Sequence, residues 1–139
     1  MITIVPPFFI DECWYLVEPM LRKATDLTEG RYDTESIREE LLREVQQLWL
    51  IFDEDGLNAA MTTSVIKYPL KKTLNIMFLG GEDFLDSVVD ADSVLSEWGK
   101  DHGCECLELC GRRGWERSLK KVGFKPTFVS LSKELSDAR

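Results

Sequence analysis

Few side chains in this sequence combine a reactive group with a spacing that would let them do chemistry together. The single histidine, His102, precedes Gly103 at the expected end of a helix, where an imidazole usually complements the helix dipole. Cys104, Cys106 and Cys110 follow at even spacing, so a strand would present all three on one face. No Ser-His-Asp set, paired-carboxylate motif, P-loop or dinucleotide fingerprint occurs. The sequence therefore identifies no catalytic residue.

The spacing of the cysteines argues against the two commonest roles of clustered thiols. Residues i and i+2 of a strand do not suit a disulfide, and these positions do not match a tetrahedral zinc site. Cys13 falls apart from the others, in a helical pattern. We expect all four thiols to be reduced, metal-free and buried as small apolar side chains in a reducing compartment.

Composition predicts one ordinary globular domain. The chain has 139 residues, of which 44% are apolar and 30% charged, so we assign residues 1–139 to a single domain with a polar, frayed tail from about residue 132. A net charge of −8 argues against binding to nucleic acid or to an anionic membrane. No apolar run approaches the ~20 residues of a membrane span, and the first residues lack the basic region of a signal peptide. We expect a cytoplasmic protein.

The first half of the chain predicts two helices between short strands. Apolar residues recur every three or four positions from 10 to 24, with Asp11 as the expected N-cap. Pro19 predicts a kink or a junction of two helices near Glu18. The expected elements are a strand at 2–5, a helix at 10–24, a helix capped by Asp33 or Thr34, and strands at 47–53 and 57–68.

The second half alternates strands and helices. Gly80 and Gly81 are expected to break a strand, and Asp92 or Ser93 to mark a local break in the following helix. The expected elements are a strand at 73–79, a helix at 84–100, a strand at 104–110, a helix at 115–122 and a strand at 127–131.

The resulting order, β-α-α-β-β-β-α-β-α-β, predicts an α/β fold with a mixed sheet and helices on both faces. Short turns make the first strands antiparallel. The strands at 73–79 and 104–110 must be parallel neighbours, because a helix crosses between them. We expect them to diverge near Leu79 and Cys110.

This order, with a strand, Gly-Gly and helix at 73–102 and a strand, turn, helix and Gly-Phe at 104–124, resembles the GNAT N-acetyltransferase superfamily. The resemblance implies that acetyl-CoA lies between the two parallel strands, with its pyrophosphate on backbone N–H groups at a helix N-terminus. It implies cofactor contacts through a tight glycine loop, formed by Phe78, Leu79, Gly80 and Gly81, and through Arg112.

Three positions depart from the pattern of that superfamily. Glu82 and Asp83 place negative charge near the expected phosphates, and no arginine in the loop offsets them. Leu119 stands four residues before Gly123, where the superfamily has the tyrosine that protonates the departing thiolate. We therefore expect weak acetyl-CoA binding, and no metal.

Segments 2–7, 14–24 and 110–124 also resemble small GNAT-type proteins encoded among the structural genes of tailed phages. That resemblance implies other phage structural proteins as partners and packaging from the host cytoplasm into the virion. Two functions remain open. One is an acetyl-CoA-dependent N-acetyltransferase with a degenerate active site; the other is a non-catalytic virion, internal core or assembly protein that retains the fold. The acceptor amine and the oligomeric state stay open.

Overall fold

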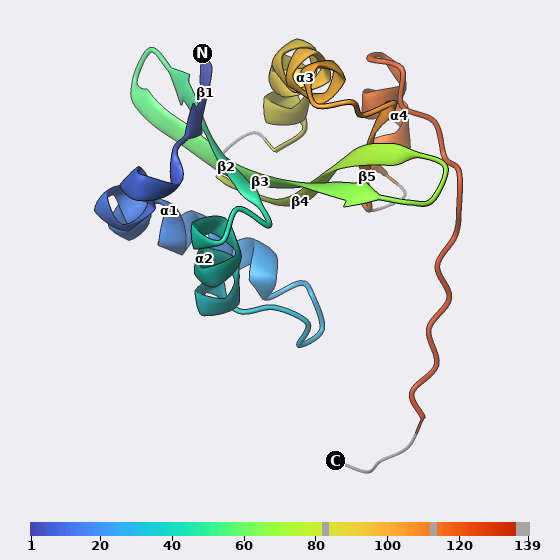
Figure 1. The fold of residues 1–139 in the computed structure, drawn as a ribbon, viewed down its shortest axis with the longest axis horizontal. Helices are drawn as coiled ribbons and strands as arrows, with labels where there is room; N and C mark the ends of the chain where they lie inside the picture. The colour runs from blue at the N-terminus through green and yellow to red at the C-terminus, as the bar shows by residue number, and fades with distance from the viewer. Residues whose placement is uncertain (82–83, 112–113, 136–139) are drawn as a thin grey trace.

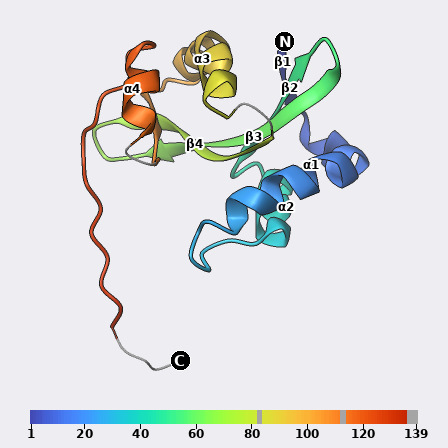
Figure 2. The same ribbon diagram turned by 180° about the vertical axis from the view of Figure 1, so that it is seen from behind.

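The computed structural model describes residues 1–81, 84–111 and 114–135. The chain folds into a single mixed sheet with helices on both faces (Figure 1). Helices α1 and α2 cover one face, and α3 and α4 cover the other (Figures 1 and 2). The predicted α/β class is confirmed. The elements are β1 (Ile2–Val5), the 3-10 turn η1 (Pro7–Phe9), α1 (Ile10–Thr25), α2 (Thr34–Leu42), β2 (Gln47–Asp53), β3 (Gly56–Lys67), β4 (Lys72–Gly81), α3 (Phe84–Asp101), β5 (Cys106–Leu109) and α4 (Trp115–Lys120).

The strands follow the order β1-β2-β3-β4-β5 across the sheet. The first four pair antiparallel. Short turns join β2 to β3 and β3 to β4, whereas η1, α1 and α2 lie between β1 and β2. β4 and β5 pair in parallel from Thr73–Cys106 to Ile76–Leu109, because α3 carries the chain back between them. The prediction of parallel neighbours is therefore confirmed.

Each face of the sheet has its own apolar core. Beneath α3 and α4, Trp49 and Leu95 are almost completely buried, and the Trp49 indole donates a hydrogen bond to the Thr63 hydroxyl at 2.9 Å. Beneath α1 and α2, Val17 and Phe78 belong to the second core. The sheet is thus buried on both sides, as its apolar strands predict.

The helix starts confirm one sequence prediction and correct another. Asp33 caps α2 by accepting from the Ser36 N–H at 2.8 Å, while the Ser36 hydroxyl accepts from the Asp33 N–H. Asp11 is not the cap of α1, because that helix begins after Phe9 without a side-chain cap. Asp11 lies in the first turn and pairs with Arg38 at 2.7 Å instead.

Three expected interruptions are absent. α1 runs through Pro19 as one helix, so of the two predicted alternatives, a kink or a junction of two helices near Glu18, the junction is wrong. α3 continues through Asp92 and Ser93 without a break. β4 continues through Gly80 and Gly81, because these two residues pair antiparallel with Ala60 and Ala59 of β3.

The strand expected at 127–131 does not form. The chain leaves α4, and from residue 125 it runs as an extended arm away from the sheet (Figures 1 and 2). The prediction from its β-prone residues is wrong because a strand needs a hydrogen-bonded neighbour, and this segment makes no backbone hydrogen bond to another described residue. Within the described residues, no helix is long and apolar enough to cross a membrane.

Candidate functional site

A β-bulge lies in β4 near the middle of the sheet. Thr62 pairs with Phe78 and Thr63 with Ile76, so Met77 has no partner on β3. Met77 and Phe78 consequently both contact the core under α1 and α2, while Ile76 and Leu79 belong to the core on the other face. A bulge bends its strand and increases the local twist, so it directs the end of β4 away from the regular sheet.

The parallel pairing of β4 and β5 stops at this bulge. Its last pair is Ile76–Leu109, whereas β4 continues through Gly81. Backbone N–H and C=O groups of a strand alternate between its two sides, so those of 77–81 that do not face β3 point into the space that β5 leaves. The pairing ends slightly before the predicted divergence at Leu79 and Cys110.

The structure gathers four of the five predicted cofactor residues on that strand end. Phe78 and Leu79 are only 6% and 5% exposed as whole residues, so their side chains lie in the two cores and are not available to a ligand. Gly80 is buried within the strand rather than in the expected loop, and Gly81 follows it with φ near 140°. Arg112 lies outside the described residues, as do Glu82 and Asp83.

Gly80 is required by close packing. A Cβ at this position would lie 1.9 Å from the carbonyl oxygen of Met20, so only glycine lets the backbone of α1 rest on β4. This contact places the second half of α1 beside the end of the bulged strand.

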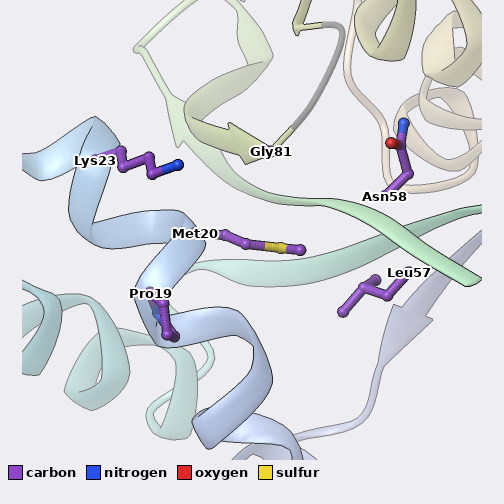
Figure 3. A pocket seen from close by; sticks show the side chains of 6 residues that line it. All are labelled: Pro19, Met20, Lys23, Leu57, Asn58 and Gly81. Atoms are coloured by element: carbon purple, nitrogen blue, oxygen red, sulfur yellow. The ribbon is translucent and has the colours of Figure 1, made fainter.

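A pocket of about 260 Å³ opens where α1, β3 and the end of β4 meet (Figure 3). Figure 3 shows Lys23 and Met20 extending from α1 toward the strands. Lys23 is exposed and brings a positive charge close to Gly81. The sequence does not predict this pocket, because nothing in the spacing of the α1 and β3 residues indicates that they meet. Its lining residues are Pro19, Met20, Lys23, Leu57, Asn58 and Gly81.

No side chain with an acidic proton occupies the position of the expected general acid. Leu119 is 3% exposed and belongs to the core under α3 and α4. Cys110 follows the last residue of β5 and is exposed, which corrects the expectation that it is buried. Trp115 packs closely over Gly111, where an added Cβ would lie 2.0 Å from the indole, so this contact requires glycine.

The remaining reactive side chains, His102 and the other cysteines, lie away from the pocket at Gly81. His102 stacks on Trp98 at 3.7 Å between ring centroids, beside Lys72 at the start of β4 and so at the opposite end of that strand from Gly81. Burial raises the pKa of the Cys104 thiol, and the Lys72 charge offsets only part of that rise. The thiols are unpaired, and Cys13, Cys104 and Cys106 are half-buried rather than fully buried as expected. Among the described residues, no three His, Cys, Asp or Glu side chains are grouped to hold a metal ion.

Several solved structures with the same arrangement are described as acetyltransferases. A probable acetyltransferase superimposes with a TM-score of 0.70 at 14% identity, covering 99% of both chains. Glucosamine-6-phosphate N-acetyltransferase from Arabidopsis thaliana gives 0.63 at 15%, covering 98% of each. A predicted acetyltransferase from Clostridium acetobutylicum, solved with acetyl-CoA, gives 0.64 at 15%, covering 97% of this chain and 96% of that one.

No protein-family model matches the chain, and no curated protein sequence matches it. The likeness is therefore one of fold: the chain has the mixed α/β fold of the GNAT acetyltransferases.

Proposed function

We propose that this protein is an acetyl-CoA-dependent N-acetyltransferase with a degenerate active site. The observation that carries the proposal is the coincidence of the Met77 bulge with the end of the β4–β5 pairing, which leaves the 77–81 edge of β4 without a strand. An extended ligand with amide groups can pair with such an edge as a strand would. The pantetheine arm of coenzyme A has that chemistry.

The residues present fit the cofactor in part. The strand edge offers backbone donors and acceptors, and Lys23 supplies a positive charge near the point where a phosphate would leave the sheet. Against this, Glu82 and Asp83 follow Gly81 directly in the sequence and repel a phosphate. The fit supports binding that is weak but localised.

The chain contributes to the reaction mainly by positioning. Acyl transfer joins an amine nitrogen to the acyl carbon and releases a thiolate, which is a good leaving group. Holding an amine against a thioester that lies along the β4 edge would make the attack effectively intramolecular. Since Leu119 has no proton to donate, the thiolate would take its proton from water.

The test is a titration of ¹⁵N-labelled protein with acetyl-CoA, followed by amide chemical shifts. We expect saturable changes at 77–81 and at the end of β5, with a dissociation constant of about 0.1 to 1 mM. Free adenosine serves as the control ligand. Changes confined to other regions, or none at several millimolar, would refute the proposal.

Lys23 provides a second test of the site. Lys23→Glu should weaken acetyl-CoA binding by roughly fivefold, because one charge near a phosphate is reversed at a solvent-exposed position. Lys100→Glu, an equally exposed change near the end of α3, is the matched control. Equal affinities for both variants in calorimetry would place the phosphates elsewhere.

A second candidate function rests on Leu119. Leu119 stands where the general acid is expected, has no proton to donate and is buried in the core. This favours the non-catalytic alternative, a phage-type virion, internal core or assembly protein with phage structural proteins as partners. Absence of acetyl-CoA binding in both experiments, together with co-assembly with such proteins, is the outcome that this alternative predicts.

A further inference from the structure

The hairpin formed by β3 and β4 carries a charge opposite to that of the whole chain. Residues 56–81 contain no aspartate or glutamate, although the protein has a net charge of −8. Their three basic residues, Lys67, Lys71 and Lys72, all lie at or beside the turn between the two strands. The hairpin therefore contributes only positive charge, and all of it at one end of the sheet.

The three lysines have no carboxylate partner within the described residues, where none of them forms an ion pair. Lys67 and Lys72 stand directly opposite each other across the hairpin, and like charges in that arrangement are destabilising. The Lys72 ammonium donates to the His102 carbonyl oxygen at 2.9 Å, which holds the side chain but leaves its charge uncompensated. Such an arrangement indicates an anionic partner outside the chain.

The acidic turn at 53–55 lies at the far end of β3. A strand of 12 residues separates it from the lysines, or roughly 35 Å at the usual rise of a strand. That distance is several times the ~8 Å Debye length at physiological ionic strength. Exposed Asp101 and Glu105 oppose the lysines more closely, and Lys100 adds to the positive charge beside them. The net charge of the chain therefore does not describe the potential at the hairpin turn.

The same turn exposes two large apolar side chains. Leu70 is 95% exposed and Tyr68 is 51% exposed. The turn is closed by the Tyr68 N–H, which donates to the Lys71 carbonyl oxygen at 2.7 Å, and Pro69 restricts its backbone. Figure 1 shows that the hairpin projects at one end of the sheet, clear of α1 and α2. An apolar tip flanked by lysines therefore projects from the fold on a short, closed turn.

We propose that the turn between β3 and β4 binds the surface of an anionic membrane, independently of the site at Gly81. Leu70 would enter the boundary between headgroups and acyl chains, Tyr68 would lie at headgroup level, and the lysines would contact anionic headgroups. Each lysine near such a surface strengthens binding about fivefold.

Three properties of the turn favour a lipid surface over other anionic partners. A fluid surface accepts a protruding side chain without a complementary pocket. Lysine is depleted from protein–protein interfaces, which argues against an acidic protein. The phosphate backbone that dominates nucleic-acid contacts offers no apolar environment for Leu70.

Sedimentation of the full chain with vesicles tests the proposal. With vesicles of 70% phosphatidylcholine and 30% phosphatidylserine, we expect half-maximal binding near ~1 mM lipid at low ionic strength. Binding should weaken at least about tenfold on pure phosphatidylcholine, and also in 0.5 M salt. Leu70→Asp, and separately Lys67→Glu with Lys71→Glu, should each weaken it at least about tenfold. These side chains are exposed, so the melting temperature should not change.

Matched control variants change the same properties elsewhere. Leu27→Asp removes an exposed leucine from the α1–α2 connection, and Arg31→Glu with Arg43→Glu reverses two exposed charges beside α2. Both should bind the vesicles as the wild type does. Equal losses in the hairpin and control variants would mean that overall charge or apolarity, rather than the turn, determines binding, and would overturn the proposal.

Paramagnetic lipid identifies the surface that contacts the membrane. A nitroxide on the acyl chains of bicelles with the same composition should broaden the amide signals of residues 67–71 of ¹⁵N-labelled protein before those of other elements. Broadening confined to the arm after α4, or no binding at several millimolar anionic lipid, would overturn the proposal. Tighter binding to polyglutamate or to duplex DNA than to the vesicles would also overturn it, in favour of an acidic protein or a nucleic acid.

Discussion

Replacing Gly80 by alanine should lower the stability of the protein by about 3 kcal/mol, near the upper end of the cost of inserting a methyl group into a packed interior. The new Cβ would lie 1.9 Å from the Met20 carbonyl oxygen and 2.5 Å from its carbonyl carbon. Both are backbone atoms, so no side-chain rotation relieves the clash. Either α1 must move off the sheet or the end of β4 must shift.

Thermal and urea denaturation measure this effect, and the melting temperature should fall by roughly 10 °C for a chain of this size. Gly114→Ala is the matched control, because no atom lies within 4 Å of its Cβ position and its backbone is helical. That variant should melt close to the wild type. If Gly80→Ala did so as well, α1 would not be seated on β4 as described.

Removing the two charges after β4 should tighten cofactor binding. We expect Glu82→Gln combined with Asp83→Asn to increase acetyl-CoA affinity roughly tenfold to thirtyfold, because two like charges no longer oppose the pyrophosphate. The gain should shrink at high salt, where partly exposed charges are screened.

Isothermal calorimetry at low and high ionic strength measures that change. The control is Glu97→Gln with Asp101→Asn, which removes the same charge from exposed positions near the opposite end of α3. Identical affinities for the two double variants would mean that the phosphates do not approach residues 82–83. The proposed site would then need to be moved, whereas loss of all binding would instead favour the non-catalytic function.

Local signals in the sequence determined most of the elements. The apolar run at 47–53 forms β2 at the predicted residues, and Asp33 caps α2, because short-range pattern and capping chemistry act within a few residues. The helix between β4 and β5 requires the two strands to be parallel, because it carries the chain back to the end of the sheet at which β4 began. The α/β class and the parallel pairing of β4 with β5 therefore follow from the sequence.

Tertiary contacts decided the rest. β4 includes Gly80 and Gly81 because these residues pair with Ala60 and Ala59 of β3. The sequence around the two glycines does not indicate this pairing. The Met77 bulge depends on the register between β3 and β4. The pocket is lined by both Lys23 of α1 and Gly81 of β4, which are far apart in the sequence. The segment 127–131 has strand-forming residues, but among the described residues no other segment pairs with it. Backbone pairing depends on two segments, whereas propensity belongs to one.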